Sequence, residues 1–439
     1  MRPYEEAAYG FGPIENLWWG RTVPPTNTPP LTQDHTCDVA IVGAGFTGLS
    51  AAYHLARNGV NVSVFDAQYP AFGASGRNGG FCCLGGGLIS NSALEKLGGK
   101  EEVQRYRATE LQAVDHVRQF MDDHNVDADV HSQGETLLAH TPRRANFEGY
   151  AREIEESYGV SPTLHSKSDL EHMGLGGRFF GGLTTPIGFG LNPQKYAWAL
   201  LQAAQEAGAC VFSNSAIVYI QAGPSVRLST SAHQITAKSA IIATNGYSSD
   251  VVPQWMRARF LPVQSSVIVT RPLSEQEQQA QGWTSDQMAY DTRQLLHYFR
   301  KLPDGRFLFG MRGGLQFTAA SERRIRAKIK DDFHRMFPSW RHVEIEHYWS
   351  GLVCFNRTLA PFVGALPKAN NLYAAFGYHG NGVAMASYCG RAIAEMTLCH
   401  HSNSLPKVMQ RIPRQYPLGR FRRNLLRPAY AAMTLTDLW

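Results

Sequence analysis

The chain has 439 residues, of which 44% are hydrophobic and 18% are charged. At roughly 150 residues per domain, this length predicts more than one folding unit, and the hydrophobic content excludes a disordered chain. The formal net charge of +6 comes from scattered lysines and arginines, which favours an anionic ligand or surface over dedicated nucleic-acid binding.

The cysteine pattern indicates a reduced protein. Seven cysteines are few for this length, odd in number and irregularly spaced, so we expect neither a disulfide framework nor a zinc site, and we expect a cytoplasmic location. No apolar run reaches the roughly 18 residues that a transmembrane helix needs.

The first 36 residues form a lead-in segment. They contain the pair Trp18–Trp19 and then the proline-rich stretch Pro24–Pro30. Because prolines remove hydrogen-bond donors and disfavour helix, this segment is predicted to be an extended arm on the surface, anchored by the two tryptophans.

A complete strand–helix–strand unit follows. Val39–Val42 is an apolar run typical of a buried parallel strand, and an Ala/Leu-rich helix extends to about Asn58. Asn61–Phe65 alternates as a second strand and ends at Asp66. The glycines between the first strand and the helix therefore stand in the context that a dinucleotide-binding motif requires, although a chance glycine pattern in an ordinary crossover gives the same spacing.

Each residue of that motif has a physical reason. Gly43 allows the tight turn, Gly45 allows the backbone to approach a pyrophosphate, and Gly48 allows the helix to pack close to the sheet. The helix N-terminus favours phosphate, and Asp66 can accept hydrogen bonds from ribose hydroxyls while disfavouring a 2′-phosphate. The candidate cofactor contacts here are Gly43, Gly45, Phe46, Thr47, Gly48, Asp66 and Ala67.

The remaining pattern alternates helices and strands before it becomes mostly β. A glycine-dense loop covers residues 73–80, and a strong hairpin pattern, Asp304–Gly305, lies in the β-rich part. We expect helices over 94–122, 143–158, 193–207 and 382–398, a basic helix from 321 to about 337, strands over 131–140, 240–243, 267–270, 295–300 and 307–311, and a last nucleotide-domain segment over 349–376.

Several segments together resemble one family. The run from Asp38 to Gly43 and the sequence Gly-Ala-Ser-Gly-Arg-Asn-Gly-Gly at 73–80 are similar to the D-amino-acid-oxidase superfamily of FAD-dependent amine oxidoreductases. Within it, the chain most resembles the gamma-glutamylputrescine oxidoreductase-like branch, which is related to glycine and sarcosine oxidases. Further similar segments occur in the family's order over about residues 37–400, at 191–196, 243–247, 291–300 and 377–383.

The resemblance implies an α/β fold. A dinucleotide-binding, Rossmann-like FAD domain would be assembled from separated segments, with a second, mixed and mostly antiparallel sheet as the substrate domain. The expected divisions are an arm over 1–36, an FAD domain over 37–92, 192–250 and 345–400, a substrate domain over 93–191 and 251–344, and a basic tail over 401–439.

The resemblance also implies which residues contact FAD. Ile217 would lie near the adenine, and the loop 377–383 would lie at the pyrimidine end of the flavin. The cofactor is expected to be bound non-covalently, with attachment through Cys354 as the alternative. The further candidate contacts are Ala74, Ser75, Arg77, Asn78, Gly79, Gly80, Thr244, Asn245, Gly246, Gly377, Tyr378, Gly380, Asn381, Gly382 and Val383.

The implied reaction moves a hydride from the carbon next to nitrogen of an amine or amino acid to the flavin, and the resulting imine hydrolyses in water. Oxidation of a 2-hydroxy acid and non-catalytic flavin binding are the alternatives, and an NAD-dependent dehydrogenase is disfavoured by the loop 73–80. The electron acceptor is oxygen, or a quinone or electron-transfer partner, because the stretch 306–310 lacks the lysine that sarcosine-oxidase relatives carry near the flavin.

Four side chains are the candidates for contact with substrate. His379 lies on the expected flavin loop, and Arg312 could hold a substrate carboxylate bidentately. In a strand, His297 and Tyr298 point to opposite faces, so either one could face the flavin while the other is structural. The tail's mixture of basic and apolar residues favours a solvated helix face over contact with an anionic membrane.

Overall fold

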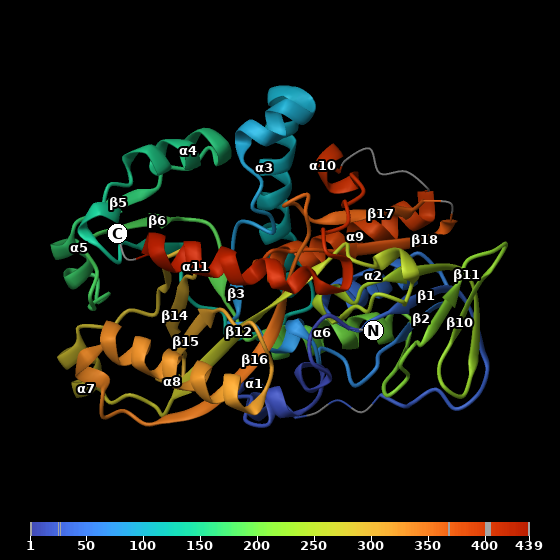
Figure 1. Ribbon diagram of the computed structural model, residues 1–439, viewed down its shortest axis with the longest axis horizontal. Helices are drawn as coiled ribbons and strands as arrows, with labels where there is room; N and C mark the ends of the chain where they lie inside the picture. The colour runs from blue at the N-terminus through green and yellow to red at the C-terminus, as the bar shows by residue number, and fades with distance from the viewer. Residues whose placement is uncertain (1, 25, 27, 368, 400–404, 438–439) are drawn as a thin grey trace.

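The computed structural model describes residues 2–437 except 25, 27, 368 and 400–404, and the strands of that part form two large sheets (Figure 1). Each large sheet has eight strands, and a two-stranded ribbon joins β3 (Phe81–Cys82) to β7 (Phe189–Gly190). The arrangement confirms the predicted α/β class with a parallel dinucleotide-type sheet and a mixed second sheet.

The first sheet has the order β17-β18-β11-β1-β2-β8, with β9 and β10 extending from β11. The central strand β1 pairs in parallel with both β2 and β11, and β11 pairs in parallel with β18. Their bounds are β1 His35–Val42, β2 Val62–Phe65, β8 Cys210–Phe212, β9 Tyr219–Gln221, β10 Val226–Ser229, β11 Gln234–Ile242, β17 Phe362–Leu366 and β18 Ala369–Phe376. Because both faces are covered there, β2 and the second half of β1, Val39–Val42, are nearly continuous apolar runs.

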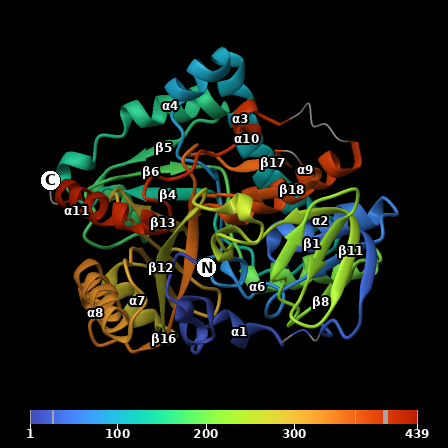
Figure 2. The ribbon, with the colours of Figure 1, turned by 45° about the vertical axis from the view of Figure 1, so that its right-hand side comes forward.

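Helices cover one face of the first sheet (Figure 2). The apolar faces of α2 (Phe46–Arg57), α6 (Pro193–Glu206) and α9 (Gly382–Cys399) share one core with the long α3 (Asn91–Asp123). The side chain of Asn192 caps α6, and proline occupies its first position, as the sequence predicts.

The second sheet is mostly antiparallel, in the order β16-β12-β15-β14-β13-β4-β6-β5. Only β13 and β4 pair in parallel within it. An aromatic-rich core lies between this sheet and α8 (Ala319–Met336). The other bounds are β4 Glu135–Leu138, β5 Thr163–His165, β6 Gly182–Thr185, β12 Leu261–Thr270, β13 Met288–Asp291, β14 His297–Lys301, β15 Phe307–Arg312, β16 Ile345–Phe355, α4 Glu148–Tyr158, α5 Lys167–His172 and α7 Glu275–Gln281.

Strand β16 differs from its expected place. The expected FAD domain includes 345–400, but β16 pairs with β12 over nearly its whole length in the second sheet. From Ser350 onward its residues alternate between buried and half-buried, which is typical of a strand with only one face in the core.

The N-terminal segment is not an extended arm over its first part. It forms the short helical turns Glu6–Tyr9 and Gly12–Ile14 and the helix α1 (Trp19–Thr22). Tyr4, Tyr9 and Trp19 are buried against the second sheet. The apolar area of these aromatic side chains outweighs the extended preference of the prolines that follow. Part of the proline-rich stretch falls on residues 25 and 27, outside the described residues.

The C-terminal segment also packs onto the body of the protein. It contains α10 (Lys407–Gln410), a 3-10 helix over Gly419–Leu425 and α11 (Leu426–Asp437). Helix α11 lies on the side of the molecule that holds the second sheet (Figure 1). Arg422 is fully buried and pairs with Asp250 through two hydrogen bonds of 2.9 and 2.8 Å. This arginine therefore does not lie on a solvated helix face. In the described part of the chain, no helix has both the length and the apolar character needed to cross a bilayer.

We expect Arg422→Ala to lower the free energy of unfolding by about 3 to 5 kcal/mol, because it leaves the Asp250 carboxylate buried without its partner. Urea unfolding followed by tryptophan fluorescence measures the change. Arg420→Ala is the matched control, because Arg420 is exposed two residues away. Equal stability of the two variants would contradict the structural role assigned to the buried pair.

Candidate active site

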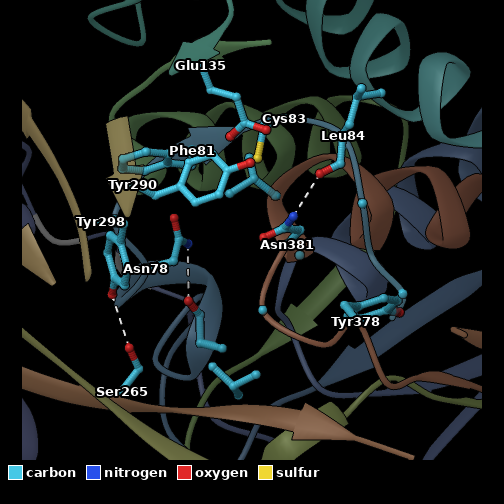
Figure 3. A pocket seen from close by; sticks show the side chains of 18 of the residues that line it. Asn78, Phe81, Cys83, Leu84, Glu135, Ser265, Tyr290, Tyr298, Tyr378 and Asn381 are labelled. Carbon is cyan, nitrogen blue, oxygen red and sulfur yellow. Dashed lines mark hydrogen bonds between the residues drawn. The ribbon is translucent and has the colours of Figure 1, made fainter. Parts of the chain in front are cut away.

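A cavity of about 370 Å³ lies between the loops of the first sheet and the faces of the second (Figure 3). Of the residues predicted from the sequence, one group lines this cavity and another lies beside it, at the ends of the parallel strands. The predicted residues that line it are Phe46, Ala74, Ser75, Arg77, Asn78, Gly79, Asn245, Tyr298, Arg312, Cys354, Tyr378, Gly380, Asn381, Gly382 and Val383.

The second group gathers because four parallel strands end at one edge. Gly43 follows β1, Asp66 follows β2, Thr244 lies just beyond β11 and Gly377 follows β18. Ligands of such sheets bind outside the carboxyl ends of the strands. The backbone N–H of Gly377 donates to Asn245 Oδ1 at 2.9 Å, which ties two of these ends together.

The glycine motif forms the close-packed cradle that the sequence predicts. Gly43 has a φ of 103°, and a Cβ at Gly48 would lie only 1.9 Å from the carbonyl oxygen of Gly43. A Cβ at Gly45 would lie 2.8 Å from Ser75 Oγ. Helix α2 begins directly after Gly45, so its N-terminus lies where glycines allow a ligand to approach the backbone closely. These residues fit a pyrophosphate.

Asp66 lies at the other side of this cradle. Its carboxylate accepts hydrogen bonds from the backbone N–H groups of Ala44 at 2.7 Å and Gln68 at 2.9 Å. Burial raises the Asp66 pKa, and these two hydrogen bonds oppose the rise. Ala67 is exposed, while Ile217 is half-buried against the core on the opposite face of the first sheet.

The loop 73–80 connects the cradle to the cavity. Ser75 Oγ accepts a hydrogen bond of 2.9 Å from the backbone N–H of Phe46, at the first residue of α2. The Asn78 side chain spans the loop, donating to Ser75 O at 2.8 Å and accepting from the Gly80 N–H at 2.8 Å. The loop is thus rigid before any ligand binds, which favours tight binding.

The loop 377–383 closes the cavity from the other side. The Tyr378 hydroxyl bonds to Thr47 Oγ1 at 2.7 Å, which ties this loop to α2. Asn381 Nδ2 donates to Leu84 O at 2.7 Å, and α9 begins at Gly382 with its N-terminus beside the cavity (Figure 3). A helix N-terminus in this position favours developing negative charge.

His379 does not face the cavity, contrary to its prediction as a substrate contact. Its Nδ1 bonds to Gly86 O at 3.1 Å and its Nε2 accepts from the backbone N–H of Asn356 at 3.3 Å. Burial lowers its pKa to about 4, so it is neutral at pH 7. The side chain points inward because the backbone at this position has a φ of 50°, and it fastens three loops together.

His297 is also buried away from the cavity. Its Nδ1 lies 2.9 Å from Asp291 and its Nε2 lies 3.2 Å from Asp332, and the ring stacks on Phe309. Burial lowers the His297 pKa, but the two carboxylates outweigh it and the net shift is upward. Strand alternation decides the outcome, because His297 faces α8 while Tyr298 faces the cavity.

Tyr298 and Arg312 lie on neighbouring strands and line the cavity. The Tyr298 hydroxyl lies 3.1 Å from Ser265 Oγ. A Cβ at Gly380 would lie 2.4 Å from an Arg312 guanidinium nitrogen, so Arg312 touches the loop 377–383. Within the described residues, no ion pair or hydrogen bond of the Arg312 guanidinium group is found. Burial lowers its pKa.

Glu135 lies at the cavity although no sequence motif predicts it. This residue begins β4 and lines the cavity beside Cys83 and Tyr290 (Figure 3). Burial raises its pKa to about 7, although a hydrogen bond with the Cys83 thiol opposes the rise. Nothing in the short stretch around it forms a motif, and a lone carboxyl in a half-buried strand is the only feature that could have drawn attention to it.

Cys354 lines the cavity but is poorly suited to covalent attachment. Its side chain is buried, and burial raises the pKa of its thiol to about 12. The thiolate is the nucleophilic form, so a protonated thiol is unreactive. The structure therefore favours non-covalent FAD.

The fold and the cradle define a protein that binds a dinucleotide at the edge of a parallel sheet. Residues 38–396 match the DAO family, described as FAD dependent oxidoreductase. The chain belongs to this family, so it is an FAD-dependent oxidoreductase, and the resemblance found in the sequence is confirmed.

The chain is similar over most of its length to curated proteins. It is 32% identical over 96% of its length to the probable oxidoreductase OrdL of Rhizobium meliloti (strain 1021), of which it covers 97%. It is 29% identical over 83% of its length to the gamma-glutamylputrescine oxidoreductase of Escherichia coli (strain K12), of which it covers 84%. Among solved structures, glycine oxidase from Geobacillus kaustophilus shares the fold, with a TM-score of 0.69 at 18% identity, covering 87% of this chain and 99% of the other.

We expect Gly48→Ala to yield protein that has lost most of its FAD, because the added Cβ would clash with the Gly43 carbonyl and open the cradle. The ratio of flavin absorbance at about 450 nm to protein absorbance measures the loss. Gly149→Ala is the control, since Gly149 lies within a helix and a Cβ there meets nothing within 4 Å. Full flavin content in Gly48→Ala would contradict the cradle.

We expect Glu135→Gln to stabilise the protein more at pH 8 than at pH 5. The wild-type carboxyl has a folded-state pKa of about 7, against a reference value of 4.5. The unfolded chain therefore loses this proton first, and wild-type stability falls as pH rises from about 4.5 to about 7 and is level above. Glutamine removes this loss, so the difference in melting temperature between variant and wild type should grow by roughly 2 °C. A difference that does not change with pH would contradict the raised pKa.

Proposed function

We propose that the protein oxidises an amino acid, or a related amine that carries a carboxylate, by transfer of a hydride from the carbon next to nitrogen. The observation that carries the proposal is Arg312, a half-buried guanidinium group that faces the cavity beside the loop 377–383 and has no ion pair or hydrogen bond in the described residues. An unpaired charge partly removed from water is costly, and a substrate carboxylate would compensate it bidentately.

The family membership supplies the redox chemistry, since bound FAD accepts the hydride. The chain's own residues would supply binding and orientation. Arg312 would fix the carboxylate, the ring of Tyr298 would form a wall of the pocket, and the N-terminus of α9 would favour negative charge beside it. The positive charge of Arg312 would also favour the neutral form of the reacting amine.

The names of the relatives support this class of substrate. One relative is a gamma-glutamylputrescine oxidoreductase and one structural neighbour is a glycine oxidase. No lysine lines the cavity within the described residues. The electron acceptor is therefore oxygen, or a quinone or electron-transfer partner, and the reoxidation experiment below distinguishes them. Six free cysteines in the described part of the chain support a cytoplasmic location.

We expect amines or amino acids, and not 2-hydroxy acids, to bleach the flavin in an anaerobic absorbance titration of the holoenzyme. Arg312→Gln should lower kcat/KM for substrates with a carboxylate by at least about 100-fold, or ~2.7 kcal/mol, because the carboxylate loses a desolvated partner. Readmitting air then separates an oxidase, which reoxidises at once, from a dehydrogenase.

Arg324→Gln is the matched control, because Arg324 is exposed on α8. Bleaching by 2-hydroxy acids alone would replace the proposed reaction with hydroxy-acid oxidation. A flavin that no donor bleaches would remove the proposal altogether, and unchanged kinetics in Arg312→Gln would remove the role of this arginine.

A further inference from the structure

We propose that Glu135, together with Tyr150 and Tyr290, forms a cation subsite that binds a second, non-reacting basic group of the substrate. This inference rests on the proposed function, and it narrows the substrate class to amino acids or carboxylated amines with an additional ammonium or guanidinium group. The subsite lies in the same cavity as Arg312.

Three different elements build the subsite. Glu135 begins β4, Tyr290 lies on the neighbouring strand β13, and Tyr150 lies on α4. The two tyrosine side chains share a hydrogen bond, and Tyr290 interacts electrostatically with Glu135. Tyr150 is 43% exposed and lies where the cavity meets solvent. A carboxylate flanked by aromatic rings is a chemistry suited to an organic cation.

Glu135 has no cationic partner in the described residues and, unlike Asp66 and Glu102, whose carboxylates accept backbone N–H groups, it has no backbone donor there either. Glu110 pairs with Arg107 at 2.7 Å, and Asp250 pairs with Arg422 at 2.8 Å. In the chain as far as the structure describes it, no lysine, arginine or histidine makes an ion pair with Glu135, and its hydrogen-bonding partner is the Cys83 thiol. A ligand cation would supply the missing partner.

Arg312 and Glu135 form no ion pair with each other in the described part of the chain. Cys83 and Tyr290 each interact electrostatically with both groups. An acid and a base without ion-pair partners therefore line one cavity, together with Cys83 and Tyr290. A ligand whose carboxylate and basic group are separated by a short carbon chain would satisfy both charges at once.

The experiment compares two probes of the same shape that differ in charge. Flavin absorbance changes of the holoenzyme report binding of 4-guanidinobutanoate and of its neutral isostere 4-ureidobutanoate. The span is varied with 3-guanidinopropanoate and 6-guanidinohexanoate, each paired with its own ureido isostere. We expect the wild type to bind the best guanidino probe at least about tenfold more tightly than the matching ureido compound. In Glu135→Gln this ratio should fall to within about twofold.

Glu156→Gln is the matched control, because Glu156 is exposed on α4, and it should keep the wild-type ratio. No preference for the charged probes in the wild type, or a preference that persists in Glu135→Gln, would overturn the subsite. If Glu135→Gln fails to retain FAD, Glu135→Asp replaces it. The shorter aspartate side chain places the carboxylate one methylene farther back, so the guanidino probe that binds most tightly should be a longer one. If the same probe still binds most tightly, the proposal is overturned.

The binding assay needs no turnover, so the two proposals can fail separately. If no amine bleaches the flavin, the probe ratio can still be measured and the proposed reaction alone is wrong. If Glu135 instead served as a base for the reacting amine, Glu135→Gln would slow flavin reduction by amines with and without a second cation alike. The probe ratio of Glu135→Gln would then stay at the wild-type value. That combination would also overturn the subsite.

Discussion

The site depends on three successive backbone carbonyls of the loop 73–80. The carbonyl oxygens of residues 77–79 accept N–H hydrogen bonds from Trp349 at 2.8 Å, Trp19 at 2.8 Å and Arg300 at 2.9 Å. Trp349 and Arg300 belong to the second sheet, and Trp19 belongs to the N-terminal segment packed on it. Buried carbonyls must be satisfied, so the loop 73–80 takes its shape only when the second sheet packs against it. These three hydrogen bonds therefore connect the loop expected to bind the cofactor with the sheet that lines the pocket.

Local patterns predicted the parts of this arrangement that local physics decides. The glycines at 43–48 and the apolar runs that end β1 and form β2 follow rules that act within a few residues, so the cradle could be predicted without a structure. The roles of His297 and His379 could not, because a strand offers two equivalent faces and a loop offers many directions. Packing against α8 and a positive φ, both outside the sequence pattern, placed these rings in the interior.

Buried charges in this protein have two different uses. Arg422 is buried to fasten the C-terminal segment and Arg300 to hold the loop 73–80. Oxygen acceptors bind Arg422, and Arg300 donates to two carbonyl oxygens and bonds to His131 Nε2. Arg312 and Glu135 are half-buried at the cavity without such partners in the described residues. Stability alone would select against both, because an apolar residue of similar volume would cost less. The ligand that we propose would bring the complementary charges, and this would separate functional from structural charge on physical grounds.

A segment outside the family match supports residues beside the cavity. The family match covers residues 38–396, whereas α11 lies beyond it and covers part of the second sheet. The Asp437 carboxylate accepts the backbone N–H groups of Gln294 at 2.7 Å and Leu295 at 3.3 Å, next to the cavity-lining Leu296. Tyr430 interacts electrostatically with Arg312. The residues that line the cavity all fall within the family match, while a helix outside it supports the backbone beside Leu296.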